Sequence, residues 1–269
     1  MPLVVSPVVE DDIPIIVAIE HAAVAQSPLH PLSIARRRLA NFEANREVSE
    51  EEYLKRMGDV VRTAFRRRAE DNTSFYRVTD TGIPSECDKY HGIVSFIVWR
   101  IETRDGYSGN TDSDEKGCET RGSTRIAASR PSQQGATSRD LTRIDEERMS
   151  AFSETAVGRE LNRLAALFRK KHFPNEPYLL FEVGMTLPAY WRRGALSLLI
   201  KHAVKVADER GIISAMQASD MGWRLYQKLG FEVMNETVLD LRPFGINACI
   251  PHRDMMRRPK ALLKSTAKL

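Results

Sequence analysis

Cysteine is scarce in this chain of 269 residues, and the few that occur are scattered. Cys87, Cys118 and Cys249 form no C-x-x-C pair, a pattern that favours a reducing compartment. We therefore expect the cytoplasm as the location, with the nucleus as the open alternative. No stretch approaches the roughly 18 uninterrupted apolar residues of a membrane-spanning helix, so we expect no membrane partner.

Metal ligands are also sparse. The six histidines show no pairing at helical i, i+4 spacing, and Cys87 with His91 would supply only two ligands. We predict no metal. The net charge of +4 is mildly basic and would suit either an anionic small molecule or nucleic acid. The basic runs lack the interleaved aromatics of a single-strand binder, which makes nucleic acid the less favoured partner.

The composition changes along the chain and divides it into three parts. Residues 102–140 consist mainly of Ser, Thr, Gly, Asp, Arg and Gln, and bury too little apolar surface to offset the entropy of ordering. We interpret them as a disordered insertion in a single domain at 1–245. From Pro243 the chain is basic and broken by proline, so we expect residues 246–269 to form a loosely packed tail.

Helical and extended patterns alternate within the predicted domain. A helix is indicated where Asp11 or Asp12 precedes Pro14, and another where Ser49 and Glu52 form a capping box. A third is expected from about 141 to 171. Short apolar or alternating runs predict strands, at 3–5, 73–79, 92–100, 178–186, 212–217 and 232–241. This alternation favours an α/β or α+β fold of three layers around a mixed sheet.

The most informative stretch is residues 178–231, which predicts a strand, a basic turn, an amphipathic helix, a second strand and a short helix. The first N–H groups of a helix have no intrahelical partner, and the helix dipole adds partial positive charge there. Arg192 and Arg193 add full charges just before Gly194, where the backbone can approach an anion closely. The turn therefore predicts a site for a pyrophosphate held by main-chain amides.

Two motifs in this stretch resemble motifs A and B of the GNAT superfamily of acetyl-CoA-dependent N-acetyltransferases. Pro188-Ala189-Tyr190 precedes the run Trp191 to Leu196, which matches Gln/Arg-x-x-Gly-x-Gly/Ala at its central Gly194. Tyr226 then precedes Gly230-Phe231, as in Tyr-x-x-x-Gly-Phe. Trp191 stands where Gln or Arg is usual, and Leu196 where Gly or Ala is usual.

The resemblance implies a GNAT-like fold whose sheet is splayed between two central strands, here 178–186 and 212–218. It also implies acetyl-CoA as cosubstrate and a small-molecule or protein amine as acceptor. The early helices and the loops around the cleft would select that acceptor, and nothing in the sequence indicates its identity or the oligomeric state. The predicted cofactor-binding residues are Met185, Thr186, Trp191, Arg192, Arg193, Gly194, Ala195, Leu196, Ser197, Ser219 and Gly222.

Two residues are candidates for catalysis. Tyr226 would hydrogen-bond or protonate the departing thiolate, and the missing side chain of Gly222, four residues earlier, would admit the cofactor. Glu182 lies inside an apolar strand, where burial would raise its pKa toward that of a general base. Strand alternation would place Glu182 on the same face as Gly184 and Thr186.

Other interpretations stay open at this point. Leu196 would either crowd the anion or turn into the core, and we expect it to weaken CoA binding. Ser219 would contact the cofactor or cap the last helix, and we favour the cap. Tyr226 would otherwise be a core tyrosine, and Glu182 a carboxylate that is paired with an arginine or faces solvent at the splayed sheet. The alternatives to an N-acetyltransferase are a non-catalytic CoA-binding relative and a basic interaction module.

Overall fold

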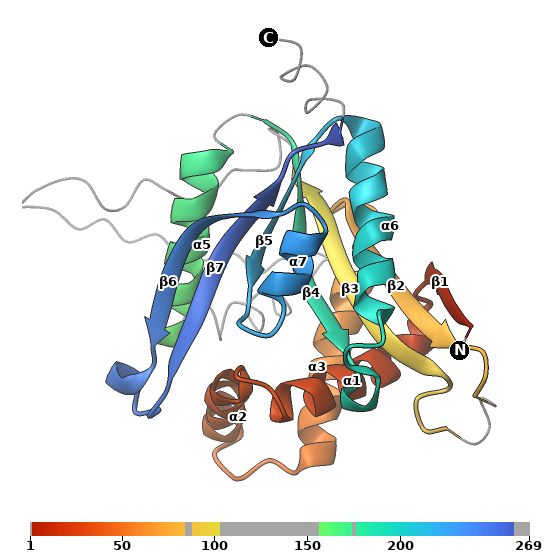
Figure 1. Cartoon of the computed structure of the whole chain (residues 1–269). Coiled ribbons are helices and arrows are strands. Elements are labelled where there is room, and N and C mark those ends of the chain that lie inside the picture. Colours follow the sequence, from red (N-terminus) through yellow and green to blue (C-terminus); the bar gives the residue numbers. More distant parts are fainter. Residues whose placement is uncertain (1, 84–87, 103–155, 174–175, 261–269) are drawn as a thin grey trace, which may run out of the picture.

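The computed structural model describes residues 2–83, 88–102, 156–173 and 176–260. The predicted insertion at 102–140 and the start of the helix expected from 141 lie almost wholly outside these residues. Within them, seven strands form one mixed sheet in the order β1-β2-β3-β4-β5-β7-β6 (Figure 1). The strands are β1 (Leu3–Pro7), β2 (Thr73–Asp80), β3 (Ile93–Glu102), β4 (Tyr178–Thr186), β5 (Ile213–Ala218), β6 (Glu232–Asp240) and β7 (Cys249–Arg257).

Helices cover both faces of the sheet, so the expected three-layer α/β architecture is confirmed (Figure 1). The α-helices are α1 (Ile13–Ala25), α2 (His30–Ala44), α3 (Glu50–Arg66), α5 (Ala156–His172), α6 (Ala195–Arg210) and α7 (Trp223–Lys228). Helices α6 and α7 pack on one face, where Trp99, Leu199 and Phe231 are buried. Helices α1 and α3 cover β2 and β3 on the other face, and α5 covers β5 and β7 beside them.

The two central strands, β4 and β5, run parallel and then separate. Their pairing runs from Tyr178 with Ile213 to Phe181 with Met216, and no further pair joins them. Beyond this point β4 continues beside β3, while β5 continues beside β7. Apolar side chains of α6 pack across β3 and β4 and hold this arrangement from one side. The sheet is therefore splayed between β4 and β5, as expected.

A β-bulge interrupts β4 at the point of separation. Phe181 lies opposite Trp99 and Val183 lies opposite Val98, so Glu182 is the extra residue. One extra residue reverses the alternation of faces. Before the bulge Phe181 packs toward α6, and after it Val183 packs toward α1 and α3. The expectation that Glu182 shares a face with Gly184 and Thr186 is wrong, because it assumed an unbroken strand.

Two parts of the fold differ from the sequence prediction. Residues 249–257 are strand β7, inserted between β5 and β6, so the loosely packed tail predicted from 246 is wrong for this segment. Arg257 is only 7% exposed because it forms a bidentate pair with Asp208. Helix α2 was not among the helices predicted from the sequence. It contains Pro31 in its first turn, a position where proline is well tolerated.

Candidate functional site

The turn from β4 to α6 leaves the first amides of the helix open. Arg192 and Gly194 both have left-handed backbone conformations, with φ of 64° and 89°. The N–H of Leu198 donates to the carbonyl of Gly194, so the N–H groups of residues 195–197 precede the first intrahelical bond. Among the described residues no side chain caps this end. A Cβ atom on Gly194 would meet no described atom within 4 Å beyond its chain neighbours.

Two side chains fix the turn to the sheet. The indole N–H of Trp191 donates to the carbonyl of Thr186 at 2.8 Å, which ties the turn to the end of β4. The hydroxyl of Tyr190 donates to Asp80 at 2.9 Å, and that carboxylate is only 1% exposed. The guanidinium carbon of Arg193 lies 5.2 Å from the centroid of the Tyr190 ring. The predicted pyrophosphate turn is thus held by contacts that do not use its own first helical amides.

Leu196 points into the core. Its Cδ1 atom lies 3.1 Å from the position a Cβ atom on Gly184 would take, so the leucine packs over β4 where that strand has no side chain. The space around Gly194 is left open. Of the two expectations for this side chain, rotation into the core is the one observed. The predicted weakening of CoA binding stays a prediction.

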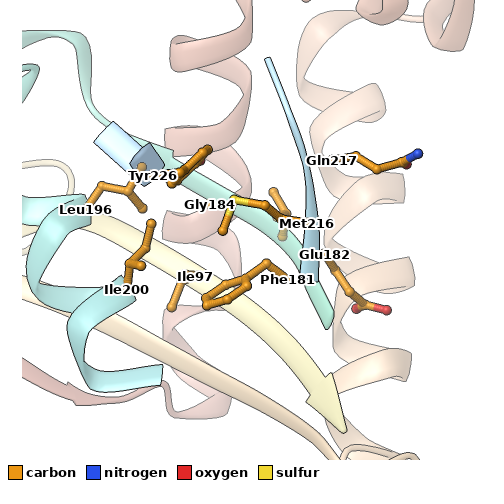
Figure 2. A pocket seen from close by; sticks show the side chains of 10 residues that line it. Ile97, Phe181, Glu182, Gly184, Leu196, Ile200, Met216, Gln217 and Tyr226 are labelled. Atoms are coloured by element: carbon orange, nitrogen blue, oxygen red, sulfur yellow. The ribbon is translucent and has the colours of Figure 1, made fainter. Parts of the chain in front are cut away.

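A pocket of about 310 Å³, part of it open to solvent, lies where β4 and β5 separate. Figure 2 shows Tyr226, Leu196 and Ile200 on one side of β4, the strand to which Gly184 belongs. On the other side, the ends of Glu182 and Gln217 point away from Tyr226 (Figure 2). The divergence of the two strands thus brings a phenol and two polar groups to one opening from opposite faces of the sheet.

The ring of Tyr226 folds back over Gly222. A Cβ atom on that glycine would come within 2.9 Å of the ring, so any larger residue would displace the tyrosine. The glycine therefore has a role in placing Tyr226, while its predicted contact with a cofactor is untested. Burial raises the pKa of Tyr226 to about 12, which keeps the phenol protonated at neutral pH. No hydrogen-bond partner of its hydroxyl occurs among the described residues, so this donor is left for a ligand.

Glu182 is paired with a cation at the edge of the pocket. Its carboxylate lies 3.0 Å from the Arg100 guanidinium, and its side chain is 33% exposed. Burial raises the pKa of this carboxyl, and Arg100 acts in the opposite direction. Arg100 is also paired with Glu102 at 2.6 Å, so its charge is shared between two carboxylates. The ion pair expected as the alternative is present, and the raised pKa is still the direction a general base needs.

The remaining predicted residues do not line the pocket. The Thr186 hydroxyl lies 2.8 Å from that of Ser95, which donates to the carbonyl of Met185 at 2.8 Å. The expected cap by Ser219 is wrong. Helix α7 has Gly222 as its N-cap with no side-chain cap, and Ser219 contributes only its carbonyl, which accepts the amide of Trp223 at 3.2 Å. Contact of these residues with a cofactor stays a prediction.

Gln217 lines the pocket, although no sequence pattern singles it out. Its amide donates to Asp254 at 3.1 Å, and Asp254 is a neighbour only because β7 pairs with β5. With Asp254 assigned to a tail, the pair was not recognisable from the sequence.

Two structural findings bear on the expected partners. Within the part of the chain that the structure describes, no three His, Cys, Asp or Glu side chains gather closely enough to hold a metal ion. None of the described helices combines the length and the apolar character needed to cross a bilayer.

Solved structures of acetyltransferases resemble this chain at low sequence identity. A histone acetyltransferase HPA2 and related acetyltransferase from Corynebacterium glutamicum is 15% identical, with a TM-score of 0.49, covering 96% of this chain and 97% of its own. NAA60 of Arabidopsis thaliana, in complex with a bisubstrate analogue, is 11% identical, with a TM-score of 0.47 and coverage of 96% and 99%. The PaiA N-acetyltransferase of Thermoplasma acidophilum, in complex with coenzyme A, is 10% identical, with a TM-score of 0.46 and coverage of 96% and 99%.

No curated protein is significantly similar in sequence. Residues 145–231, however, match the model of the acetyltransferase (GNAT) family. The matched stretch contains β4, the basic turn, α6, β5 and α7, and it ends at the Gly-Phe pair of the second motif. The mixed, splayed sheet is likewise GNAT-like. Residues 145–231 therefore resemble the acetyltransferase (GNAT) family, and the resemblance predicted from the two motifs is confirmed.

Proposed function

We propose that this protein is an N-acetyltransferase that transfers the acetyl group of acetyl-CoA to an amine by direct attack in a ternary complex. The observation that carries the proposal is the uncapped N-terminus of α6. This helix follows β4, the strand that forms one wall of the pocket. Tyr226 is half-buried and lines the same pocket, and its raised pKa keeps the hydroxyl protonated. The acceptor is a small-molecule or protein amine.

The residues of the turn fit a diphosphate. The amides of residues 195–197 have no intrahelical acceptor, and Gly194 leaves open space before them. Arg192 and Arg193 are exposed and add positive charge at the same end. Because Leu196 packs on Gly184, its side chain leaves this cradle clear. Backbone amides of Gly194–Ser197 and the two arginines would hold the diphosphate of the cosubstrate.

When bound, acetyl-CoA supplies an activated acetyl group, whose carbonyl carbon gains the amine nitrogen while its C–S bond breaks. The protein aligns the two reactants across the opening between β4 and β5. Alignment alone can contribute about 7–11 kcal/mol to lowering the barrier. The amine proton passes to Glu182, directly or through water, and the sulfur leaves as a thiolate that Tyr226 stabilises.

The pKa of Tyr226 distinguishes between its two proposed roles. A thiol has a pKa of about 8.5, so full transfer of a proton from a phenol of pKa about 12 to a thiolate is uphill. Donation of a hydrogen bond has no such cost, and it strengthens as charge develops on the sulfur. We therefore assign Tyr226 as a hydrogen-bond donor to the thiolate, which takes its proton from solvent afterwards.

The test is a CoA titration followed by acetyl-CoA turnover with pooled amines. CoA should raise Tm, and free thiol should appear only when an amine is present. Tyr226→Phe should lower kcat about 100-fold with CoA affinity unchanged. Trp223→Phe, on the same helix, is the control for a change of aromatic residue. Absence of any CoA response contradicts the proposal, and a CoA response without turnover favours the non-catalytic relative.

The role of Glu182 is tested by the pH profile. Because burial raises the pKa of Glu182, the rate should increase with pH as this carboxyl loses its proton, above the range of an ordinary glutamate. Glu182→Gln should lower kcat and remove this dependence. A profile unchanged by the substitution excludes Glu182 as the base.

A further inference from the structure

A row of polar side chains crosses the sheet next to the pocket, on three neighbouring strands. Gln217 of β5 lies directly opposite Asp254 of β7, and Asp254 lies directly opposite Asn235 of β6. The amide of Gln217 donates to one carboxylate oxygen of Asp254 at 3.1 Å, and that of Asn235 donates to the other at 3.4 Å. Asp254 is only 5% exposed, whereas Gln217 is half-buried and lines the pocket.

This arrangement fixes which way the Gln217 amide faces. A carboxylate only accepts hydrogen bonds, so the side of the amide that faces Asp254 must be its NH₂ group. The carbonyl oxygen Oε1 is then directed elsewhere, and no partner for it occurs among the described residues. Without these hydrogen-bond donors, nothing would offset the cost of burying the Asp254 carboxylate. Asp254 therefore strongly favours this one orientation of the Gln217 amide.

Gln217 and Glu182 stand on the two strands just past their last shared pair, Phe181 with Met216. Both point away from Tyr226 (Figure 2), so they lie on the side of the sheet opposite the proposed thiolate donor. An amine that attacks from that side must present its N–H groups to hydrogen-bond acceptors. The described groups placed to accept them are the Glu182 carboxylate and the Gln217 carbonyl oxygen.

We propose that Gln217 is a specificity-determining residue that binds an N–H group of the acceptor amine, and that Asp254 is the positioning residue that orients it. The inference rests on the proposed acetyltransferase function and adds the residues that recognise the acceptor. Recognition by a neutral carbonyl oxygen beside one carboxylate suits a primary amine, whose several N–H groups can reach both acceptors.

The experiment measures acetyl-CoA turnover with a pool of spermidine, glucosamine and a lysine-containing peptide with a free N-terminus. The most active of these amines is then used as the probe. Gln217→Met keeps the side-chain length and removes the hydrogen bond, and it should raise KM for the amine about fivefold. Its kcat should stay within about twofold, and the Kd for CoA should not change. Gln227→Met, at an exposed glutamine of α7, is the matched control.

Asp254→Asn tests the positioning role without touching the pocket. Asparagine can donate as well as accept, so the Gln217 amide is free to turn over and present its NH₂ group to the amine. KM for the amine should rise by a similar factor, and the double variant should be no worse than either single variant. If Asp254 has a purely structural role, Asp254→Asn should lower Tm and leave the ratio of KM for the amine to KM for acetyl-CoA unchanged.

The possible outcomes distinguish failure of the proposed acetyltransferase function from failure of the proposed role of Gln217. No turnover by the wild-type protein with any amine overturns the proposed function and this inference with it. An active wild type whose amine KM is unchanged in Gln217→Met overturns this inference alone. Equal losses of amine and CoA binding also overturn it, because they indicate general damage to the sheet. An effect of Gln217→Met without one of Asp254→Asn overturns the positioning role.

Discussion

The two ends of helix α6 have the same kind of boundary residue but differ in how their backbone groups are hydrogen-bonded. Each is bounded by a glycine in the left-handed conformation, Gly194 with φ of 89° and Gly211 with φ of 67°. At the C-terminal end the chain closes on itself, since the N–H groups of Gly211 and Ile212 donate to the carbonyls of the last turn. At the N-terminal end the amides of residues 195–197 have no intrahelical acceptor and no side-chain cap among the described residues.

The difference shows that the groups that hold the N-terminal turn in place are not the amides proposed to bind CoA. A helix end normally satisfies its orphan groups internally, as this helix does at Gly211. The N-terminal end is instead held in place from behind, by Trp191 on Thr186 and by Tyr190 on Asp80. The turn is anchored to the sheet although its first helical amides take no part in holding it. Substitutions at either end of α6 should therefore change stability, but only those at the N-terminal end should change CoA affinity.

The largest effect on CoA affinity is expected from Gly184→Val. Its side chain would collide with Leu196, whose Cδ1 atom already lies 3.1 Å from the added Cβ position, and Ile97 closes the space behind. Overpacking of this kind costs about 1–3 kcal/mol, and the leucine should be forced toward the turn. We expect the Kd for CoA to rise tenfold or more. Leu196→Ala in the same chain should restore binding, and failure of this rescue would show that Leu196 does not border the cradle.

The next prediction compares Gly194→Ala with Gly211→Ala. Both place a Cβ atom on a left-handed residue with open space around it, which costs about 1–2 kcal/mol in each case. Both variants should lose similar stability in a thermal melt. Only Gly194→Ala should weaken CoA, roughly fivefold to tenfold by calorimetric titration, because only that glycine precedes open amides. Equal CoA affinity in the two variants would contradict the proposal that only the N-terminal end of α6 binds CoA.

Tyr190→Phe tests the support behind the turn. The substitution leaves the buried Asp80 carboxylate with the amide of Gly82 and without its phenol donor. A lost hydrogen bond to a buried charge costs about 1–3 kcal/mol of stability. Part of this loss should appear as a severalfold weaker CoA affinity. Tyr76→Phe, on the same face as α6, is the control, and an equal effect on CoA in that variant would argue against a specific support.

The smallest effects are expected from the exposed arginines at the two ends. Arg192→Ala and Arg193→Ala should each weaken CoA about twofold to fivefold, and less so at high salt, because exposed charges are screened. Arg210→Ala, in the last turn, should remove only a few tenths of a kcal/mol of helix stability and leave CoA binding unchanged. Identical salt dependence in all three variants would mean that the charges act on the whole surface.

Much of the site was predictable because it is local in sequence. A strand, a basic turn and a helix that are adjacent in the chain must also be adjacent in space, so the turn at Gly194 was predicted correctly. Of the predicted capping box, the Ser49 hydroxyl does accept the Glu52 amide, but the Glu52 carboxylate binds Arg46 and Arg56. The bulge at Glu182 was not predictable, because it is defined by the partner residues Val98 and Trp99 on another strand.

The C-terminal strand was missed for a related reason. Residues 249–257 contain Pro251, His252 and three charged residues, which are types more often found exposed to solvent. Arg253 and Arg257 lose their exposure only because Asp220, Glu236 and Asp208 pair with them from distant parts of the chain. The polar row that contains Gln217 was hidden by the same omission, since its central carboxylate belongs to this strand.

The position of β7 also sets the order in which the sheet can be completed during synthesis. Strand β6 is made before β7 but borders only β7, so it has no place in the sheet until the later strand has emerged and paired with β5. Until then, the backbone of β5 is an exposed edge open to other chains. A nascent or truncated protein that stops before residue 249 would contain every predicted catalytic residue and still be prone to aggregation.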